Sequence, residues 1–334
     1  MSSRDSLTLI TDAAPEGGQS QFDPAARVYA DRTTTWSCVG RDVSECSDYR
    51  EVLAASGLDY EVEKVPLTLG DGTPVEGRVM TARRLPDGGW RTYDVVSPKY
   101  EVVQNSDAFA FVDYMGDVRF EKAGETESGM SYVIAALPAV DVLGDEFVPH
   151  VILRNGFGGN VTVQAAICPL RVVCQNQFAV AFREAGNTVR IRHVANAESR
   201  MLEAREVLRS NAEFMGLLRT RAEGLARVTV TDSDYALVEE ALFPMGGDPS
   251  EVNAYKRHRV EVAREALRLA YEAPDNEAFR GTSWGLVNAY SDYVTHLMPE
   301  GRRPTRFENR MMGTTFRPQV NRVLDVLQGM GLAA

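Results

Sequence analysis

Hydrophobic and polar residues alternate with a period of two through most of the stretch between residues 58 and 168. Apolar residues at every second position are typical of strands that bury one face. Short glycine-containing sequences such as Asp71-Gly72, Pro86-Asp-Gly-Gly89 and Glu127-Ser-Gly129 separate these segments and indicate hairpin turns. The pattern therefore predicts antiparallel strands over about 58–68, 75–84, 90–97, 118–123, 130–137, 146–154 and 160–168.

Two short helices are predicted among these strands. Ser44 or Ser47 is a suitable N-cap for a helix that stops before Gly57, because a glycine readily adopts the left-handed conformation that ends helices. Asn105 or Ser106 is a suitable N-cap for a second helix, whose apolar side would run to about residue 116.

From about residue 197 the apolar residues recur at helical spacing instead, three or four positions apart. This second pattern predicts helices over about 197–223, 232–243, 249–271, 282–298 and 318–329. Asp248-Pro249 marks the start of the third of them, because proline suits the first turn of a helix.

Strands first and helices afterwards are typical of an α+β protein. We predict an N-terminal antiparallel β-meander with a βββα core, made by the first three strands and the helix at 106–116, followed by a C-terminal helical region. Residues 1–33 are polar and aperiodic, which favours a disordered leader. The predicted domains are therefore a β-rich α+β domain over 34–196 and a helical region over 197–334 that packs on it or extends it.

The composition is that of a globular protein, with 44% hydrophobic and 25% charged residues. No run of apolar residues is long enough to span a membrane, and the N-terminus lacks the apolar segment of a secretory signal. Four cysteines in 334 residues do not make a disulfide framework. These features predict a cytoplasmic protein without a membrane segment.

The net charge of −11 is unevenly distributed along the chain. Residues 1–150 hold 26 Asp and Glu against 13 Lys and Arg, a balance of −13, whereas residues 151–334 hold 21 against 23, a balance of +2. Only four of the 36 basic residues are lysines. Arginine suits phosphate partners because its planar fork donates two parallel hydrogen bonds, although a preference for arginine codons would produce the same composition.

Two arginine-rich segments of the second half carry the candidate nucleic-acid interface. Positive charge interleaved with aromatic and amide side chains is typical of a groove that binds single strands. An exposed Phe157 on the turn Gly156-Phe-Gly-Gly159 would add a surface for stacking on a base. The alternative is a solvated helix face whose arginines pair with the acidic half or with a neighbouring subunit. The candidate residues are Arg171, Arg183, Arg190, Arg192, His193, Arg200, Arg302, Arg303, Arg306, Arg310 and Phe157.

Cysteine and glycine patterns give less support to other chemistry. Cys168 and Cys174 are spaced more widely than zinc ligands usually are, and their apolar neighbours favour buried, structural cysteines. Nothing in the sequence places His193 beside Cys174 as its base. The glycines at 156–160 lack the Lys-Ser/Thr that completes a phosphate loop. We therefore predict neither a metal nor a cofactor.

Clustered carboxylates leave a metal-dependent nuclease open as an alternative. Glu121 and Glu125 lie at the end of a predicted strand beside Lys122. Asp141 and Asp145 lie close to a predicted turn. Such acids can hold two divalent ions, but acids near turns are more often simply solvated.

Four segments of the chain occur in the order and spacing of one known family. They are Gly57-Leu-Asp-Tyr60; Tyr100-Glu-Val-Val-Gln-Asn105; Pro169-Leu-Arg-Val-Val-Cys-Gln-Asn-Gln177 with Ile191-Arg-His193; and Ser283-Trp-Gly-Leu-Val-Asn-Ala-Tyr290 with Asp292 and His296. Through them the chain resembles the phage/plasmid-like protein family catalogued as domain-of-unknown-function 932, over about residues 36–326. Gln177 and Phe157-Gly158 depart from the Thr and the His-Asp pair expected of that family.

The resemblance implies a cytoplasmic protein carried by phages, prophages and plasmids, and it implies no particular enzyme activity. The βββα order is also similar, at the level of topology, to phage and eukaryotic single-strand annealing proteins. We therefore expect a non-enzymatic homo-oligomer that binds or anneals single-stranded DNA in recombination or replication. The alternatives are a mobile-element interaction or anti-defence protein that binds a host protein through its acidic half, and the nuclease.

Overall fold

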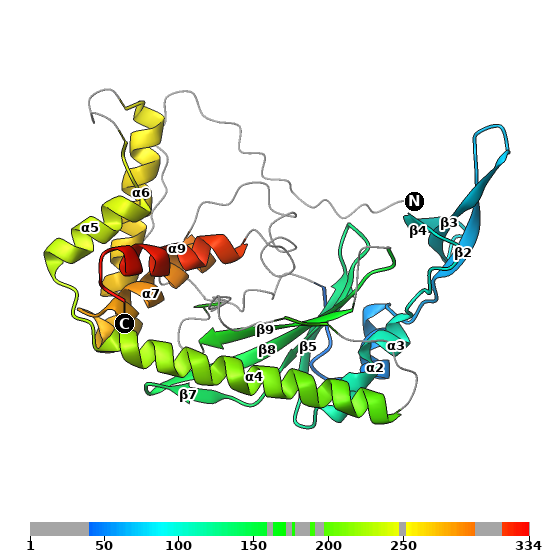
Figure 1. Cartoon of the computed structure of the whole chain (residues 1–334), viewed down its shortest axis with the longest axis horizontal. Coiled ribbons are helices and arrows are strands. Elements are labelled where there is room, and N and C mark those ends of the chain that lie inside the picture. The colour runs from blue at the N-terminus through cyan, green and yellow to red at the C-terminus, as the bar shows by residue number, and fades with distance from the viewer. Residues whose placement is uncertain are drawn as a thin grey trace, which may run out of the picture.

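The computed structural model describes residues 40–158, 163–171, 176–177, 188–190, 197–246, 252–297 and 316–333. Within these ranges antiparallel strands come first and helices follow, so the predicted α+β class is confirmed (Figure 1). The predicted leader over 1–33 and the Asp248-Pro249 helix start lie outside the described residues.

An eight-stranded antiparallel sheet forms the centre of the molecule, with the order β1-β5-β6-β8-β9-β10; β7 pairs with β8, and β11 pairs with β9. Every residue of the inner strand β6 is buried, so neither of its faces lies in solvent. A strand buried on both faces loses the alternating pattern. The strands are β1 (Arg41–Asp42), β5 (Arg119–Glu125), β6 (Ser131–Ala136), β7 (Val140–Val142), β8 (Asp145–Asn155), β9 (Gln164–Arg171), β10 (Asn176–Gln177) and β11 (Thr188–Arg190).

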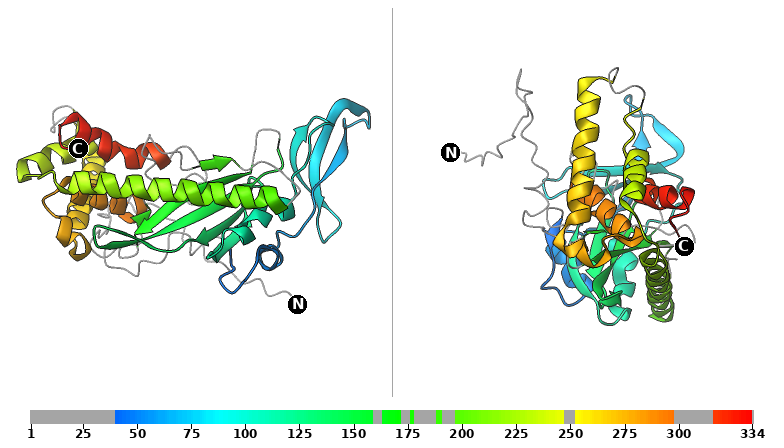
Figure 2. Two further views of the ribbon diagram at one scale, coloured as in Figure 1. Left: turned by 60° about the horizontal axis from the view of Figure 1, so that its bottom comes forward. Right: turned by 90° about the vertical axis from the view of Figure 1, so that its left-hand side faces the viewer.

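A separate three-stranded sheet, which we call the arm, consists of β2 (Glu63–Thr68), β3 (Pro74–Arg84) and β4 (Trp90–Val96). It projects from one end of the molecule (Figures 1 and 2). The three predicted strands are therefore present, but β2 begins at Glu63 and not near residue 58, and it contains Pro66 and a register shift. Few residues of the arm are buried, so most of the core lies in the strands that follow it.

Local capping differs in detail from the prediction. Helix α2 (Tyr49–Ser56) starts at Asp48, whose carboxylate accepts from two backbone amides, and not at either predicted serine. Gly57 ends it in the left-handed conformation with φ 73°, as predicted. Helix α3 (Asn105–Phe109) has no side-chain cap and continues as the 3₁₀ helix η1 (Ala110–Tyr114).

The long helix α4 (Ala197–Ala226) lies along the central sheet and joins two hydrophobic cores (Figure 1). Ala204 and Val207 in its first half pack into the core that α2, α3 and the sheet share. Phe214 and Leu218 in its second half pack with Phe147 of β8 and with the C-terminal helices. The buried positions recur three or four residues apart, which explains why the sequence pattern located this helix.

The remaining helices assemble around α7 (Ser283–Asp292), all ten of whose residues are buried. Against it pack α4, α6 and α9, the 3₁₀ helix η2 and strand β10. After α7 the chain continues as a π-helical turn, η3 (Tyr293–Leu297). The other bounds are α5 (Asp232–Leu242), α6 (Ala254–Glu272), η2 (Pro274–Phe279) and α9 (Phe316–Gly329). No helix among the described residues has the length and apolar character needed to cross a bilayer.

Gly285 illustrates how closely α7 is packed. A Cβ atom at this position would lie 2.2 Å from the carbonyl oxygen of Phe279. We expect Gly285→Ala to lower the free energy of unfolding by about 1–3 kcal/mol, because backbone has to move to admit the methyl group. Gly216→Ala on α4 is the matched control, since nothing lies within 4 Å of its added Cβ. This helical alanine is expected to raise stability by about 0.5–1 kcal/mol. Urea unfolding measures both, and equal effects would contradict the packing described.

Candidate functional site

The structure describes the side chains of two of the eleven predicted binding residues, Phe157 and Arg200. Arg171 and Arg190 lie on β9 and β11, which are neighbouring strands, but their side chains are outside the described part. Convergence of the predicted arginines on one groove therefore stays a prediction. The residues outside the described ranges altogether are Arg183, Arg192, His193, Arg302, Arg303, Arg306 and Arg310.

Phe157 was predicted to be exposed, and this is wrong. Its side chain is 2% exposed and packs against Tyr93 and Tyr60, with ring centroids 4.8 and 6.0 Å away. Its carbonyl oxygen also accepts a hydrogen bond from Thr81 Oγ1 of the arm, at 2.7 Å. The ring is buried because the base of the arm folds over the segment that follows β8, so it is not available to stack on a base.

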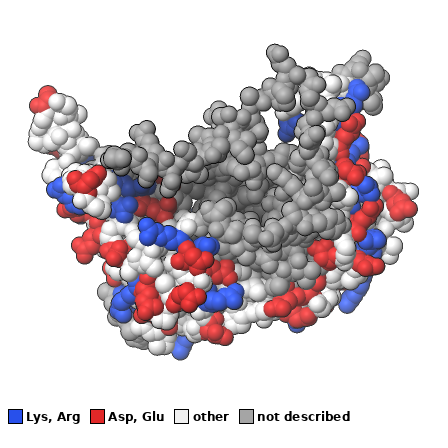
Figure 3. Space-filling view, turned by 180° about the vertical axis from the view of Figure 1, so that it is seen from behind, with Lys and Arg blue, Asp and Glu red and all other residues white. Residues whose placement is uncertain are grey.

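Arg200 forms an ion pair within its own chain, which is the alternative to DNA binding that the sequence left open. Its Nη2 lies 3.2 Å from the Asp107 carboxylate, so this arginine pairs with the acidic half of its own chain. Other helical arginines pair with glutamates of the helical region itself: Arg209 contacts Glu206 and Glu213 on α4, and Arg268 contacts Glu265 and Glu272 on α6, while Arg264 pairs with Glu240. In the view from behind, basic and acidic residues of the described part are interspersed, with no continuous basic surface (Figure 3).

The first turns of α6 are different from these paired surfaces. Tyr255, Lys256, His258 and Arg259, which we call the α6 basic end, are all exposed, and Tyr255 is 70% exposed. Every buried residue of α6 lies further along, from Ala263 onward. The yellow N-terminal part of α6 accordingly projects beyond its neighbours (Figures 1 and 2).

Electrostatics alone would not favour basic residues at the start of a helix. A helix N-terminus carries partial positive charge and favours acidic residues, yet the first turn of α6 contains none. The helix start is held by Asn253, whose Oδ1 accepts from the Tyr255 amide at 2.8 Å. Among the described residues no carboxylate forms an ion pair with Lys256 or Arg259. The Arg259 guanidinium instead lies 5.7 Å from the Tyr255 ring centroid. This combination suits an anionic, planar ligand.

Sequence reasoning missed this group because it looked for arginine density over long windows. The sequence does contain a local indication of this group, the run Tyr255-Lys-Arg-His-Arg259 at a helix start. This run contains no aliphatic residue that would be expected to be buried.

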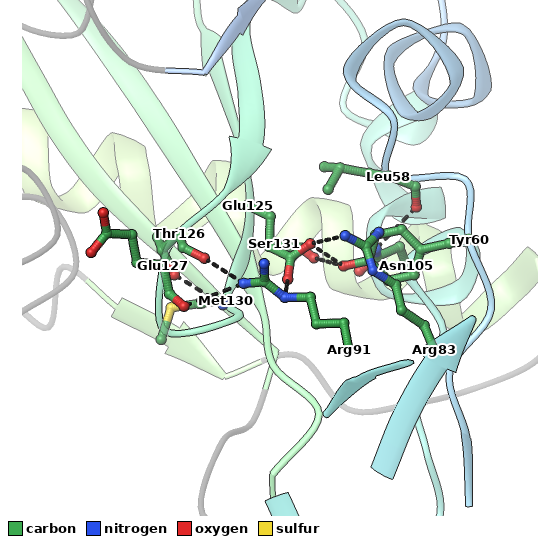
Figure 4. Close-up of polar contacts among 10 residues, drawn as sticks. All are labelled: Leu58, Tyr60, Arg83, Arg91, Asn105, Glu125, Thr126, Glu127, Met130 and Ser131. Atoms are coloured by element: carbon green, nitrogen blue, oxygen red, sulfur yellow. Dashed lines mark hydrogen bonds and ion pairs between the residues drawn. The ribbon is translucent and has the colours of Figure 1, made fainter. Parts of the chain in front are cut away.

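A second polar group lies where the arm meets the central sheet (Figure 4). The Glu125 carboxylate, 10% exposed, is 2.9 Å from Arg83 Nη2 and 2.7 Å from Arg91 Nε. The Tyr60 hydroxyl donates to the same carboxylate at 3.1 Å, and the Arg83 guanidinium lies 3.7 Å from the Tyr60 ring centroid. Burial raises the pKa of Tyr60, which therefore stays protonated and able to donate. We call this group the arm junction.

The arm junction connects the two sheets by backbone contacts as well. Arg91 Nη2 donates to the carbonyl oxygens of Thr126 and Glu127, at 3.1 and 3.3 Å. Next to it, Asn105 Nδ2 donates to the Leu58 carbonyl, and Asn105 Oδ1 accepts from Asn155 Nδ2. Two guanidinium groups thus neutralise one carboxylate and fix β4 to the turn between β5 and β6. We interpret the junction as structural.

The two glutamates considered for a nuclease have other partners, and the described cysteine of the Cys168/Cys174 pair is buried. Glu125 is occupied by the two arginines, and Glu121 contacts Arg119 at 3.0 Å and His150 at 3.3 Å. Burial raises the pKa of the Cys168 thiol to about 12, which leaves it protonated at neutral pH. Cys168 is therefore a buried structural cysteine, as predicted; Cys174 lies outside the described residues. Within the described ranges no group of three or more His, Cys, Asp or Glu residues could hold a metal ion.

Glu125→Gln tests the arm junction. We expect it to lower the free energy of unfolding by roughly 1–3 kcal/mol, because Arg83 and Arg91 would remain partly buried without a counter-charge. Glu213→Gln, which removes an exposed charge from the pair with Arg209, should change stability by about 0.5 kcal/mol or less. Equal losses in urea unfolding would show that the junction contributes no more than a surface ion pair.

Comparison with known proteins identifies a family and nothing finer. No curated protein and no solved structure matches the chain. The sequence model of the family described as "Domain of unknown function (DUF932)" matches residues 92–321, from β4 of the arm into α9. The match includes Glu125, the α6 basic end and α7, and it covers more than half of the sequence. The chain therefore belongs to the DUF932 family.

Proposed function

We propose that this protein binds single-stranded DNA without catalysing a reaction on it. The observation that carries the proposal is the α6 basic end, where an exposed tyrosine stands beside two cations, Lys256 and Arg259, that form no ion pair with a carboxylate of the described residues. Lys256 and Arg259 are free to contact phosphates, and Tyr255 presents a ring on which a base can stack.

The rest of the predicted interface would extend this surface. The candidate arginines around β9 and β11 and those in residues 302–310 belong to the same half of the chain as α6. A protein that holds a strand by its backbone leaves the bases accessible, and annealing then needs no catalytic carboxylate. We propose accordingly that the protein acts as a homo-oligomer carried by phages or plasmids, in recombination or replication.

Fluorescence anisotropy with labelled single- and double-stranded oligonucleotides over a range of salt concentrations tests the proposal. We expect Lys256→Ala with Arg259→Ala to weaken single-strand binding roughly tenfold or more and to lower the salt slope by about two, because two phosphate contacts are lost. Arg190→Ala with Arg192→Ala should also weaken binding.

The matched control is Arg209→Ala with Arg268→Ala, which removes the same charge from residues already paired with glutamates. It is expected to leave affinity within about twofold. Undetectable or salt-insensitive binding by the unmodified protein would reject the proposed function.

An interaction with a host protein is the second candidate, and one observation favours it. Burial raises the pKa of Cys46, and four carboxylates around α2, from Glu51, Asp48, Asp42 and Glu45, raise it further, so negative charge gathers there. Such a surface suits a basic partner. The test is to recover a stable complex from host lysate after nuclease treatment. If that complex is lost in the double variant Glu45→Lys with Glu51→Lys, which reverses two charges, protein binding is favoured over DNA binding.

A further inference from the structure

The arm is joined to the rest of the molecule by one of its two faces. Residues directly opposite each other in an antiparallel sheet place their side chains on the same face. Arg83 lies opposite Arg91, and both side chains reach Glu125 (Figure 4). Thr81, two residues from Arg83 along β3, shares this face and donates to the Phe157 carbonyl. The inner face of the arm is thus occupied by the arm junction.

The opposite face, which we call the outer face, carries a different set of side chains. Val65, Met80 and Val95 lie opposite one another and form a row across the three strands. Further along, Arg84 lies opposite Trp90. Val95 is 40% exposed and Trp90 is 38% exposed. Among the described residues the arm strands pack chiefly against one another, so the outer face presents apolar side chains to solvent.

Arg84 and Trp90 form the closest contact on the outer face. The Arg84 guanidinium lies 3.8 Å from the centroid of the Trp90 ring, which is the geometry of a cation–π pair. Trp90 belongs to β4, an edge strand, so no further strand of the described part lies beyond it. The part of the indole ring that Arg84 does not cover is therefore available to a ligand.

Two arginines add positive charge to the outer face. Arg78 is two residues from Met80 along β3 and shares its face with Arg84. Both arginines are exposed, and neither forms an ion pair with a carboxylate of the described residues. Glu63, opposite Ala82, is the acid that the strand register places on this face, and it pairs with neither arginine. The outer face thus combines an exposed indole ring with two cations that can contact phosphates.

We propose that the outer face of the arm is a stacking platform for single-stranded DNA, on which a base stacks on Trp90 while Arg84 and Arg78 contact phosphates. This inference rests on the proposed function and adds a second contact to it, because the arm and α6 lie at opposite ends of the molecule (Figure 1). Every base has a π face, so stacking of this kind tolerates any sequence.

Charge favours a nucleic acid over an apolar protein partner on this face. A hydrophobic partner would bury the guanidinium groups of Arg78 and Arg84 without a counter-charge, which is costly. A DNA strand supplies both a planar base for the indole and phosphates for the two arginines.

A structural role for the Arg84–Trp90 pair is the alternative, since cross-strand pairs stabilise hairpins. Arg84 Nη1 donates to the Gly88 carbonyl of the turn between β3 and β4, but at 3.4 Å this bond is long. The turn is closed by its own backbone, because the Leu85 amide donates to the Gly89 carbonyl at 2.9 Å. A structural role alone predicts lower stability on substitution and no effect on DNA binding.

Fluorescence anisotropy with a labelled single-stranded oligonucleotide of mixed sequence, over a range of salt concentrations, tests the platform. Trp90→Ala should weaken binding about tenfold and leave the salt slope unchanged, because a stacking surface is lost but no charge. Trp90→Phe keeps an aromatic ring and should weaken binding less. Arg84→Ala and Arg78→Ala should each lower the slope by about one, because each removes one phosphate contact.

The chain offers a matched control for each kind of substitution. Tyr114→Ala removes an aromatic ring of similar exposure, 39%, from η1. Arg50→Ala removes an exposed arginine that also lies beside an aromatic ring, 5.1 Å from the Tyr49 centroid, but Tyr49 is buried and offers no surface to a base. Neither control should change affinity or slope, and circular dichroism verifies that each variant is folded.

Tryptophan fluorescence gives a direct readout of stacking. An unlabelled oligonucleotide should lower the fluorescence of the unmodified protein, and Trp90→Phe should abolish most of that decrease, because Trp284 is fully buried. A decrease of equal size in Trp90→Phe would mean that no base stacks on Trp90.

The possible failures can be told apart. Wild-type affinity in Trp90→Ala together with a wild-type slope in Arg84→Ala would overturn the platform and leave the proposed function standing. If Trp90→Ala instead dissociates an oligomer in analytical ultracentrifugation and leaves DNA affinity unchanged, the outer face is a contact between copies of the chain and the platform is wrong. Absence of oligonucleotide binding by the unmodified protein would reject the proposed function and the platform with it.

Discussion

The burial of α7 on every side is the constraint on which the helical region depends. A helix without a solvent-facing side cannot form alone, so α4, α6, α9 and η2 have to pack around it together. Gly285 shows the result, because a backbone carbonyl occupies the space where a side chain would begin. The buried residues of α6 all lie in its second half, where it packs against α7. Its first two turns therefore extend into solvent.

Charge is arranged around the same framework. Arginines on the middle of α4 and on the second half of α6 meet glutamates three or four residues away, which is the spacing that places side chains on one helix face. Arg200 and the arm junction use acids from elsewhere in the chain. Lys256, Arg259 and Arg322 remain outside this pairing within the described residues, and all three belong to helices in contact with α7 or η3. Arg205 and Arg219 on α4 form no ion pair with a carboxylate of the described residues either, so unpaired cations occur at more than one place in this half.

The sequence pattern predicted those features that depend on neighbours along the chain. Turn glycines and period-two alternation located β3 and β4, turn glycines on either side located β6 and β8, and helical spacing located α4 and α5 to within a few residues. Features that depend on distant contacts were missed. The glycines around Phe157 suggested an exposed loop, and only the fold shows that Tyr60 and Tyr93 cover the ring.

The arm presents an open sheet to solvent, and such sheets tend to recruit further strands from other molecules. Its edge strand β2 is poorly suited to pairing with a strand of another molecule. Pro66 has no N–H to offer a neighbouring chain, and the register shift beside it interrupts the regular ladder. The proline thus weakens β2 as an edge for a further strand, whereas the opposite edge strand, β4, contains no proline.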